Sequence, residues 1–209
     1  MDVGELWGIG QATVPKLEMM DIKTIGDLQT ANANNLQREF VNHAAQVIER
    51  ARGIDNSPVE TDREAKSISE ERTFARDISD PEMLRKVLLN LSDEVAASLR
   101  KNALFAKTIH LKLRWHDFKT VTRQTTLGQP TQLGEEIFAA VEPLWQATWH
   151  AGEQVRLLGV AASTLSEGLQ LSLFDDVQAN KIALAKTLDQ LREQYGSKIV
   201  TRASLKKTK

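Results

Sequence analysis

The stretch from Thr108 to Trp115 alternates strictly between polar and apolar side chains. A period of two predicts a strand with one buried face. His116 and Asp117 then offer a two-residue turn, and the chain returns from Phe118 to Leu127. Because a lone hairpin is at best marginally stable in water, this segment needs further strands and a layer that covers its apolar face.

Two amphipathic helices flank the hairpin and would supply that layer. One is predicted to begin at Ser79-Asp80-Pro81-Glu82, with Ser79 as the cap, and its apolar residues recur at helical spacing as far as Leu99. The other covers 134–148. Strands are predicted over 66–74 and 154–164, which gives the order β-α-β-β-α-β. We therefore expect an α+β fold in which two helices cover one face of a four-stranded sheet and leave the other face open.

Residues 1–57 are predicted to form a separate, small all-helical domain. Short helices are expected at 3–7, at 11–20 and, capped by Thr24, at 24–28, and a longer one is expected from Asn34 to Arg52. The charged stretch 58–65 is typical of a linker. The sheet domain at 66–168 is then followed by a short peptide at 169–175 and by a C-terminal helix with a basic tail at 176–209.

Composition and motifs exclude several classes of protein. The chain has 209 residues, no cysteine and a net charge of -1. The lack of cysteine excludes disulfides and thiolate chemistry and favours a reducing cytoplasm. No apolar run approaches the roughly 20 residues of a membrane helix, so no membrane partner is expected. The histidines lack a metal-site spacing, and no glycine-rich phosphate loop is present, so we predict no catalytic residue, no metal site and no cofactor in this chain.

Cations gather around the predicted hairpin, where Asp117 is the single acid between Lys101 and Thr126. Thr108 and His110 would lie on the polar side of the sheet. Hydroxyls and cations in one face suit phosphates rather than base edges. The alternative is a solvated strand face that is rich in threonine because threonine favours strands. The candidate phosphate-binding residues are Lys66, Ser67, Ser69 and Arg72 on the first strand, Lys112 and Arg114 on the second, and Lys119, Thr120, Thr122 and Arg123 on the third.

Gly8-Ile9-Gly10 separates two predicted helices near the N-terminus. Glycines allow a tight turn and a close approach of the backbone to a ligand, and the amides that follow can face a phosphate. Ile9 would anchor the turn in the core, and Lys16 adds a nearby cation. The alternative is an ordinary tight turn between two helices.

The peptide Gln170-Leu171-Ser172-Leu173-Phe174 combines large apolar side chains with a glutamine, in a position where exposure is expected. Exposed apolar anchors suit a partner's pocket. The peptide resembles the sliding-clamp-binding peptide of bacterial replication and repair proteins. The alternative is an edge strand, because Leu169, Leu171 and Leu173 alternate with polar residues.

Taken in order, these motifs resemble the C-terminal half of a Y-family translesion DNA polymerase of the DinB class. The thumb resemblance is carried by Leu-Trp-Gly-Ile-Gly at 6–10, Thr-Ile-Gly-Asp-Leu at 24–28 and Ala-Arg-Gly-Ile-Asp at 51–55. The little-finger resemblance is carried by 66–74, 112–123 and 156–160. The family pattern has glycines near residues 40–43, and this chain has none.

The resemblance implies that a helix-hairpin-helix element and the open sheet face hold duplex primer-template DNA by its phosphates, while residues 170–174 bind the sliding clamp. In such a polymerase the palm and fingers would lie upstream of Met1, and the Mg²⁺ ions would belong to the palm. We therefore expect the chain to be inactive alone. A separate palm–fingers polymerase fragment as partner stays open, as does a free-standing, non-catalytic DNA-binding or clamp-binding protein.

Overall fold

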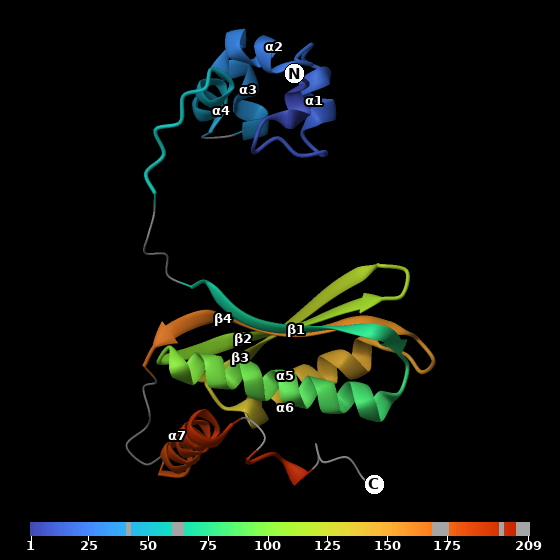
Figure 1. Ribbon diagram of the computed structural model, residues 1–209, viewed down its shortest axis with the longest axis vertical. Coiled ribbons are helices and arrows are strands. Elements are labelled where there is room, and N and C mark those ends of the chain that lie inside the picture. The colour runs from blue at the N-terminus through green and yellow to red at the C-terminus, as the bar shows by residue number, and fades with distance from the viewer. Residues whose placement is uncertain (41–42, 60–64, 169–175, 197–198, 204–209) are drawn as a thin grey trace. The chain divides into compact units, whose positions relative to one another are not determined.

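The computed structural model describes residues 1–40, 43–59, 65–168, 176–196 and 199–203 (Figure 1). The chain divides into two compact units, Met1–Arg63 and Glu64–Lys209. Each unit has its own cluster of buried apolar side chains.

None of the helices in the described ranges is long and apolar enough to cross a membrane.

The first unit is built from short helices. A 3-10 turn at Val3–Glu5 precedes α1 (Val14–Glu18), α2 (Ile25–Thr30), α3 (Ala33–Phe40) and α4 (Ala44–Ala51). Thr24 caps α2 as predicted, because its Oγ1 accepts from the Asp27 amide at 3.1 Å while the Asp27 carboxylate accepts from the Thr24 amide at 2.9 Å. Pro15 lies in the first turn of α1, where a proline costs no helical hydrogen bond.

The predicted single helix over 34–52 is wrong. The segment forms two helices, α3 and α4, and His43 before α4 has φ -113° and ψ 4°, outside the helical region. The two separate helices allow Leu36 and Ile48 to reach the same apolar core, which also contains Leu17 and Leu28. Helical spacing alone does not reveal this break, because each half keeps its own amphipathic pattern.

The second unit is a four-stranded antiparallel sheet with helices on one face (Figure 1). Its strands are β1 (Ser67–Ile78), β2 (Leu104–Trp115), β3 (Thr120–Thr131) and β4 (Val155–Glu167), arranged in the order β1-β4-β2-β3. The helices α5 (Pro81–Lys101) and α6 (Gly134–Thr148) pack on the apolar side. The predicted α+β class and the β-α-β-β-α-β order are confirmed.

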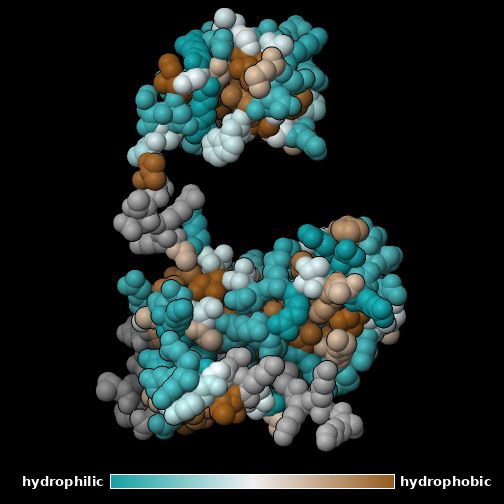
Figure 2. Space-filling view, viewed as in Figure 1, coloured by the Kyte–Doolittle hydropathy of each residue, from teal (hydrophilic) through white to brown (hydrophobic). Residues whose placement is uncertain are grey.

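The core of this unit lies between the sheet and the two helices. Ile109, Leu111 and Leu113 of β2 are fully buried, and Leu158 and Val160 of β4 lie beside them. Their partners from the helix layer, also buried, are Leu84, Leu88, Leu91, Val95 and Leu99 of α5 and Ile137, Phe138, Val141 and Trp145 of α6. Figure 2 shows hydrophilic side chains over most of the visible face of this unit, with apolar ones in separate patches.

Two local predictions at the ends of elements are wrong. Asp80, not Ser79, caps α5, and its carboxylate accepts from the Glu82 amide at 2.9 Å. The hairpin between β2 and β3 has a three-residue loop, because the Phe118 amide donates to the Trp115 carbonyl and the Trp115 amide donates to the Lys119 carbonyl, both at 3.0 Å. Phe118 takes the left-handed conformation, with φ 66°, that this loop type requires.

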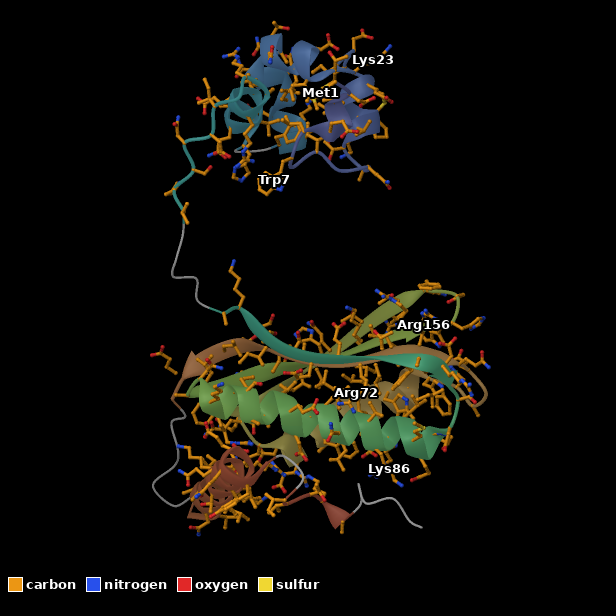
Figure 3. All side chains as sticks on the ribbon, viewed as in Figure 1. Met1, Trp7, Lys23, Arg72, Lys86 and Arg156 are labelled. Atoms are coloured by element: carbon orange, nitrogen blue, oxygen red, sulfur yellow. The ribbon has the colours of Figure 1, made fainter. Side chains whose placement is uncertain are left out.

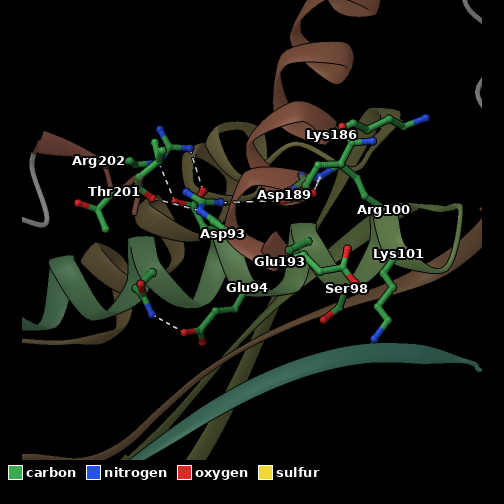
Figure 4. Close-up of a pocket in the computed structure, with 15 residues that line it drawn as sticks. Asp93, Glu94, Ser98, Arg100, Lys101, Lys186, Asp189, Glu193, Thr201 and Arg202 are labelled. Atoms are coloured by element: carbon green, nitrogen blue, oxygen red, sulfur yellow. Dashed lines mark hydrogen bonds and ion pairs between the residues drawn. The ribbon is translucent and has the colours of Figure 1, made fainter. Parts of the chain in front are cut away.

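The C-terminal helix α7 (Asp176–Tyr195) lies against α5, a point that the sequence leaves open. The guanidinium of Arg100, whose side chain is 6% exposed, donates to the Asp189 carboxylate at 2.5 and 3.0 Å. Arg202 beyond the helix returns to Asp93 of α5 at 2.7 and 2.8 Å (Figure 4). A cavity of about 630 Å³ lies between α5, α7 and residues 200–202.

Candidate nucleic-acid interface

The register of the sheet separates its side chains into two faces, because residues directly opposite each other on antiparallel strands point the same way. One face carries the core. The other, here called the open face, has four rows across β1, β4, β2 and β3: Ser67, Ser163, Thr108 and Thr126; Ser69, Ala161, His110 and Gln124; Glu71, Gly159, Lys112 and Thr122; and Thr73, Leu157, Arg114 and Thr120. Figure 1 shows α5 and α6 on the side away from it.

The open face is polar except for the three positions on β4 that hold Leu157, Gly159 and Ala161. Hydroxyls dominate it, and Lys112 and Arg114 are its two cations. Hydroxyl and cationic donors of this kind bind phosphate oxygens without distinguishing bases. The face therefore has the chemistry of a surface for a polyanion.

An acid moderates the charge of this face. Nζ of Lys112 donates to both carboxylate oxygens of Glu71 at 2.8 and 2.9 Å. Gly159 lies between these two residues in the row, and a Cβ at Gly159 would come within 2.8 Å of Cγ of Glu71. Because Gly159 has no side chain, Lys112 and Glu71 can reach each other across β4. The sequence interpretation missed Glu71, although a period of two from Ser67 and Ser69 reaches it.

His110 lies in the middle of the open face and is half-buried. Its Nε2 is 2.7 Å from the Ser163 hydroxyl, and Thr108 in the next row is within hydrogen-bond distance of Thr126 and Thr164 hydroxyls. Burial lowers the pKa of His110 below its ordinary value. The imidazole is therefore neutral near pH 7 and acts as a hydrogen-bonding group there.

Two of the predicted phosphate-binding residues lie on the wrong face. Arg72 pairs with Leu158 across the sheet, so it points to the helix layer, where it donates to Glu94 of α5 at 3.2 Å (Figure 3). Arg123 pairs with the buried Leu111 and also belongs to the helix side. Both corrections follow from the period of two, since Arg72 follows Glu71 and Arg123 follows Thr122 directly.

The other candidates of this unit lie on or beside the open face. Ser67, Ser69, Thr120 and Thr122 are exposed members of the edge strands, and Lys112 and Arg114 belong to the interior strand β2. Nε of Arg114 donates to Oγ1 of Thr120 at 2.8 Å, which fixes the guanidinium over the edge of the sheet. Lys66 is exposed just before β1, and Lys119 is exposed directly after the hairpin loop.

The turn at Gly8-Ile9-Gly10 has the predicted geometry in part. Gly8 has φ 96°, a conformation that favours glycine, and Ile9 is 6% exposed, so its side chain anchors the turn in the core of the first unit. The amides of Gly10, Gln11 and Ala12 donate no hydrogen bond to an acceptor within the described residues. A Cβ at Gly10 would meet nothing within 4 Å, so the turn presents bare, exposed backbone.

The charges beside this turn differ from the prediction. Nζ of Lys16 is 2.6 Å from a carboxylate oxygen of Glu39 on α3, so this cation is engaged in an ion pair. Arg50 of α4 instead lies next to the turn, with its guanidinium carbon 4.8 Å from the ring centroid of Trp7 and Nη1 3.9 Å from the position of a Cβ on Gly8. Trp7 is 78% exposed (Figure 3).

Comparison with known proteins assigns a family to both units. Residues 65–173 match the model of the impB/mucB/samB family C-terminal domain, and residues 4–55 match that of the DNA polymerase-iota thumb domain. A DNA polymerase IV 1 from Mesorhizobium japonicum is 40% identical over 199 residues, covering 93% of this chain and 45% of the relative. The DNA polymerase IV of Clostridium acetobutylicum is 34% identical over 209 residues, covering 98% of this chain and 52% of the relative.

The chain belongs to the Y-family DNA polymerases of the DinB class. It corresponds to a C-terminal portion of them, and it spans about half the length of the curated relatives that it matches. The family resemblance carried by the thumb and little-finger motifs is thereby confirmed.

In the described part of this DinB-class chain, no group of three or more histidine, aspartate or glutamate residues is arranged to hold a metal ion. The neighbouring acids Glu70 and Glu71 point to opposite faces of β1, as expected from strand alternation.

The proposed clamp-binding residues Gln170 to Phe174 lie outside the described residues, between the end of β4 and the start of α7.

Proposed function

We propose that this DinB-class chain is the DNA-holding portion of a translesion DNA polymerase, acting in damage bypass and repair. The observation that carries the proposal is the open face, which sets Lys112 and Arg114 among hydroxyl side chains on the side of the sheet away from α5 and α6. Primer-template duplex would lie across this face and be held by its phosphates. Such binding is largely independent of sequence and sensitive to salt, because each neutralised phosphate releases counterions.

The first unit would contribute a second grip on the duplex. The amides of Gly10, Gln11 and Ala12 have no acceptor among the described residues, and backbone amides of this kind bind phosphate oxygens. Arg50 adds a second cation beside the same turn, and like Lys16 it is ion-paired, with its Nε 3.2 Å from a carboxylate oxygen of Asp55. This helix-hairpin-helix contact is independent of base identity, like that of the open face.

The first experiment measures the affinity of the chain for primer-template duplex against salt concentration. Replacing both Lys112 and Arg114 with Ala should weaken binding and make the slope of log affinity against log salt shallower by about 1 for each phosphate that the variant no longer neutralises. Glu71→Gln should act in the opposite direction, because it frees Lys112 from its ion pair.

The matched control for this experiment removes the same charge from the helix layer. Lys86 and Lys101 of α5 have no ion pair within the described residues. Replacing both with Ala therefore removes two positive charges from the chain and leaves the open face unchanged. This double variant should keep the wild-type salt slope. No binding of the wild type at low salt, or an equally shallow slope in both double variants, would refute the proposal.

We further propose that residues 170–174 tether the chain to the bacterial sliding clamp. The support is the sequence of the peptide, with Leu173 and Phe174 as apolar anchors. Replacing both with Ala should abolish binding to the clamp and leave DNA affinity unchanged. Retained clamp binding in that variant would contradict the tether. Tethering raises the local concentration of a bound partner without any new DNA contact.

We also propose that nucleotidyl transfer with Mg²⁺ belongs to a palm–fingers portion. The support is the length of the relatives, of which this chain covers 50% and 52% in two cases. This chain would then bind, position and recruit, and the reaction would require the carboxylates of the partner portion.

A further inference from the structure

Phe118 lies at the tip of the β2–β3 hairpin in an unusual conformation. It is 63% exposed, and its φ of 66° is left-handed, which is rare for a bulky residue. This position of a three-residue hairpin loop usually holds glycine, because glycine adopts the conformation without strain. An aromatic ring at a strained and exposed position indicates a role for the ring itself.

The ring is held in place from one side. The guanidinium carbon of Arg156 lies 4.6 Å from the ring centroid, and Nη1 of Arg156 is 3.6 Å from a carboxylate oxygen of Asp77. Arg156 therefore covers one face of the ring and is itself restrained. With 63% of the residue still exposed, the opposite face of the ring is open to solvent.

The backbone of Phe118 is linked to two residues of the open face. Oγ1 of Thr120 donates to the Phe118 carbonyl at 3.4 Å and accepts from Nε of Arg114 at 2.8 Å. Lys119 is exposed directly after the loop, and its amide donates to the carboxylate of Asp117 within the loop at 3.0 Å. Arg156 is the cation in contact with the ring, and Lys119 and Arg114 are further cations at this end of the hairpin. Aromatic rings beside cations are the usual platform for an unpaired base, whose flanking phosphates the cations neutralise.

We propose that Phe118, backed by Arg156, is a stacking platform for an unpaired nucleobase at the single-stranded end of the DNA. The proposal rests on the proposed function, because it requires nucleic acid on the open face. The base would stack on the free face of the ring, forming a layer of guanidinium, phenyl ring and base. Bases inside a duplex already stack on each other, so the site selects an unpaired base.

The test compares two DNA probes of the same sequence, a blunt duplex and a primer-template with a single-stranded overhang. Phe118→Gly removes the ring and also relieves the left-handed strain, so the hairpin should keep its fold and its melting temperature. We expect this variant to bind the overhang probe more weakly by between about fivefold and a hundredfold and the blunt duplex as tightly as wild type. Phe118→Trp should retain wild-type affinity for both.

A direct readout places 2-aminopurine in the overhang. Wild-type chain should change its fluorescence by stacking, and Phe118→Gly should not. Unchanged affinity of Phe118→Gly for the overhang probe, or an equal weakening on both probes, would overturn the stacking platform. Loss of clamp binding with unchanged DNA affinity would reassign the ring to a protein contact and overturn it as well. Failure of the proposed function is distinguished by the wild-type chain not binding the blunt duplex.

Discussion

Single residues set how much positive charge the open face presents. The pair of Lys112 and Glu71 spans β4 over Gly159, and the hydrogen of that glycine leaves room for both side chains. A Cβ there would also lie 3.4 Å from Cβ of Lys112. The face therefore keeps one acid, and under the proposed function a phosphate would have to displace it from Lys112.

His110 makes the stability of the second unit depend on pH. Burial holds its pKa in the folded chain below the ordinary value of 6.5. Above that value both folded and unfolded chains are neutral at this residue, and its contribution to stability is constant. As the pH falls below it, the unfolded chain binds the proton first, so the free energy of unfolding decreases. His110→Gln keeps a partner for Ser163 and does not titrate, so we expect it to lack this decrease.

Denaturant unfolding of the two proteins over a series from about pH 8 to about pH 5 measures this difference. The wild type should lose stability relative to His110→Gln as the solution is acidified. Parallel curves, or a wild type that gains stability in acid, would show that the histidine is as accessible to protons in the folded chain as in the unfolded one.

At the scale of elements, sequence periodicity predicted the sheet well and its faces incompletely. The alternation of Thr108 to Trp115 placed Lys112 and Arg114 on the open face correctly. The prediction for Arg72 and Arg123 was wrong because it followed their positive charge and not their position in the strand. In a strand the position decides the face, and a cation one residue out of register belongs to the other side.

The packing of α7 could not be predicted from local pattern. Its main anchor joins Arg100 to Asp189, which are 89 residues apart, and Arg202 and Asp93 are 109 residues apart. Such ion pairs depend on how α5 is placed by the sheet beneath it. Lys16 of α1 and Glu39 of α3 are likewise 23 residues apart, and their ion pair depends on how these two helices pack. The period of the apolar residues predicts a helix or strand and its buried face. Contacts between distant residues depend on the complete fold and cannot be predicted from that period.

For the whole molecule, the two separate cores predict two separate unfolding events. The first unit rests on a small cluster that includes Leu28, and the second on a larger cluster that includes Leu88, both fully buried. Replacing a buried leucine with alanine costs about 2–5 kcal/mol. Leu28→Ala should therefore destabilise the first unit alone, and Leu88→Ala the second alone, because neither side chain belongs to the other core.

Hydrogen exchange followed by mass spectrometry on peptides resolves the two units and tests this expectation. In Leu28→Ala, peptides from α2 to α4 should exchange faster while those from β2 and β4 keep their protection. Leu88→Ala should give the reverse pattern. Because a small core supplies little stability, the first substitution should bring its unit close to full unfolding. Joint loss of protection in both units from either change would mean that they unfold as one cooperative body, with a coupling that their separate cores do not supply.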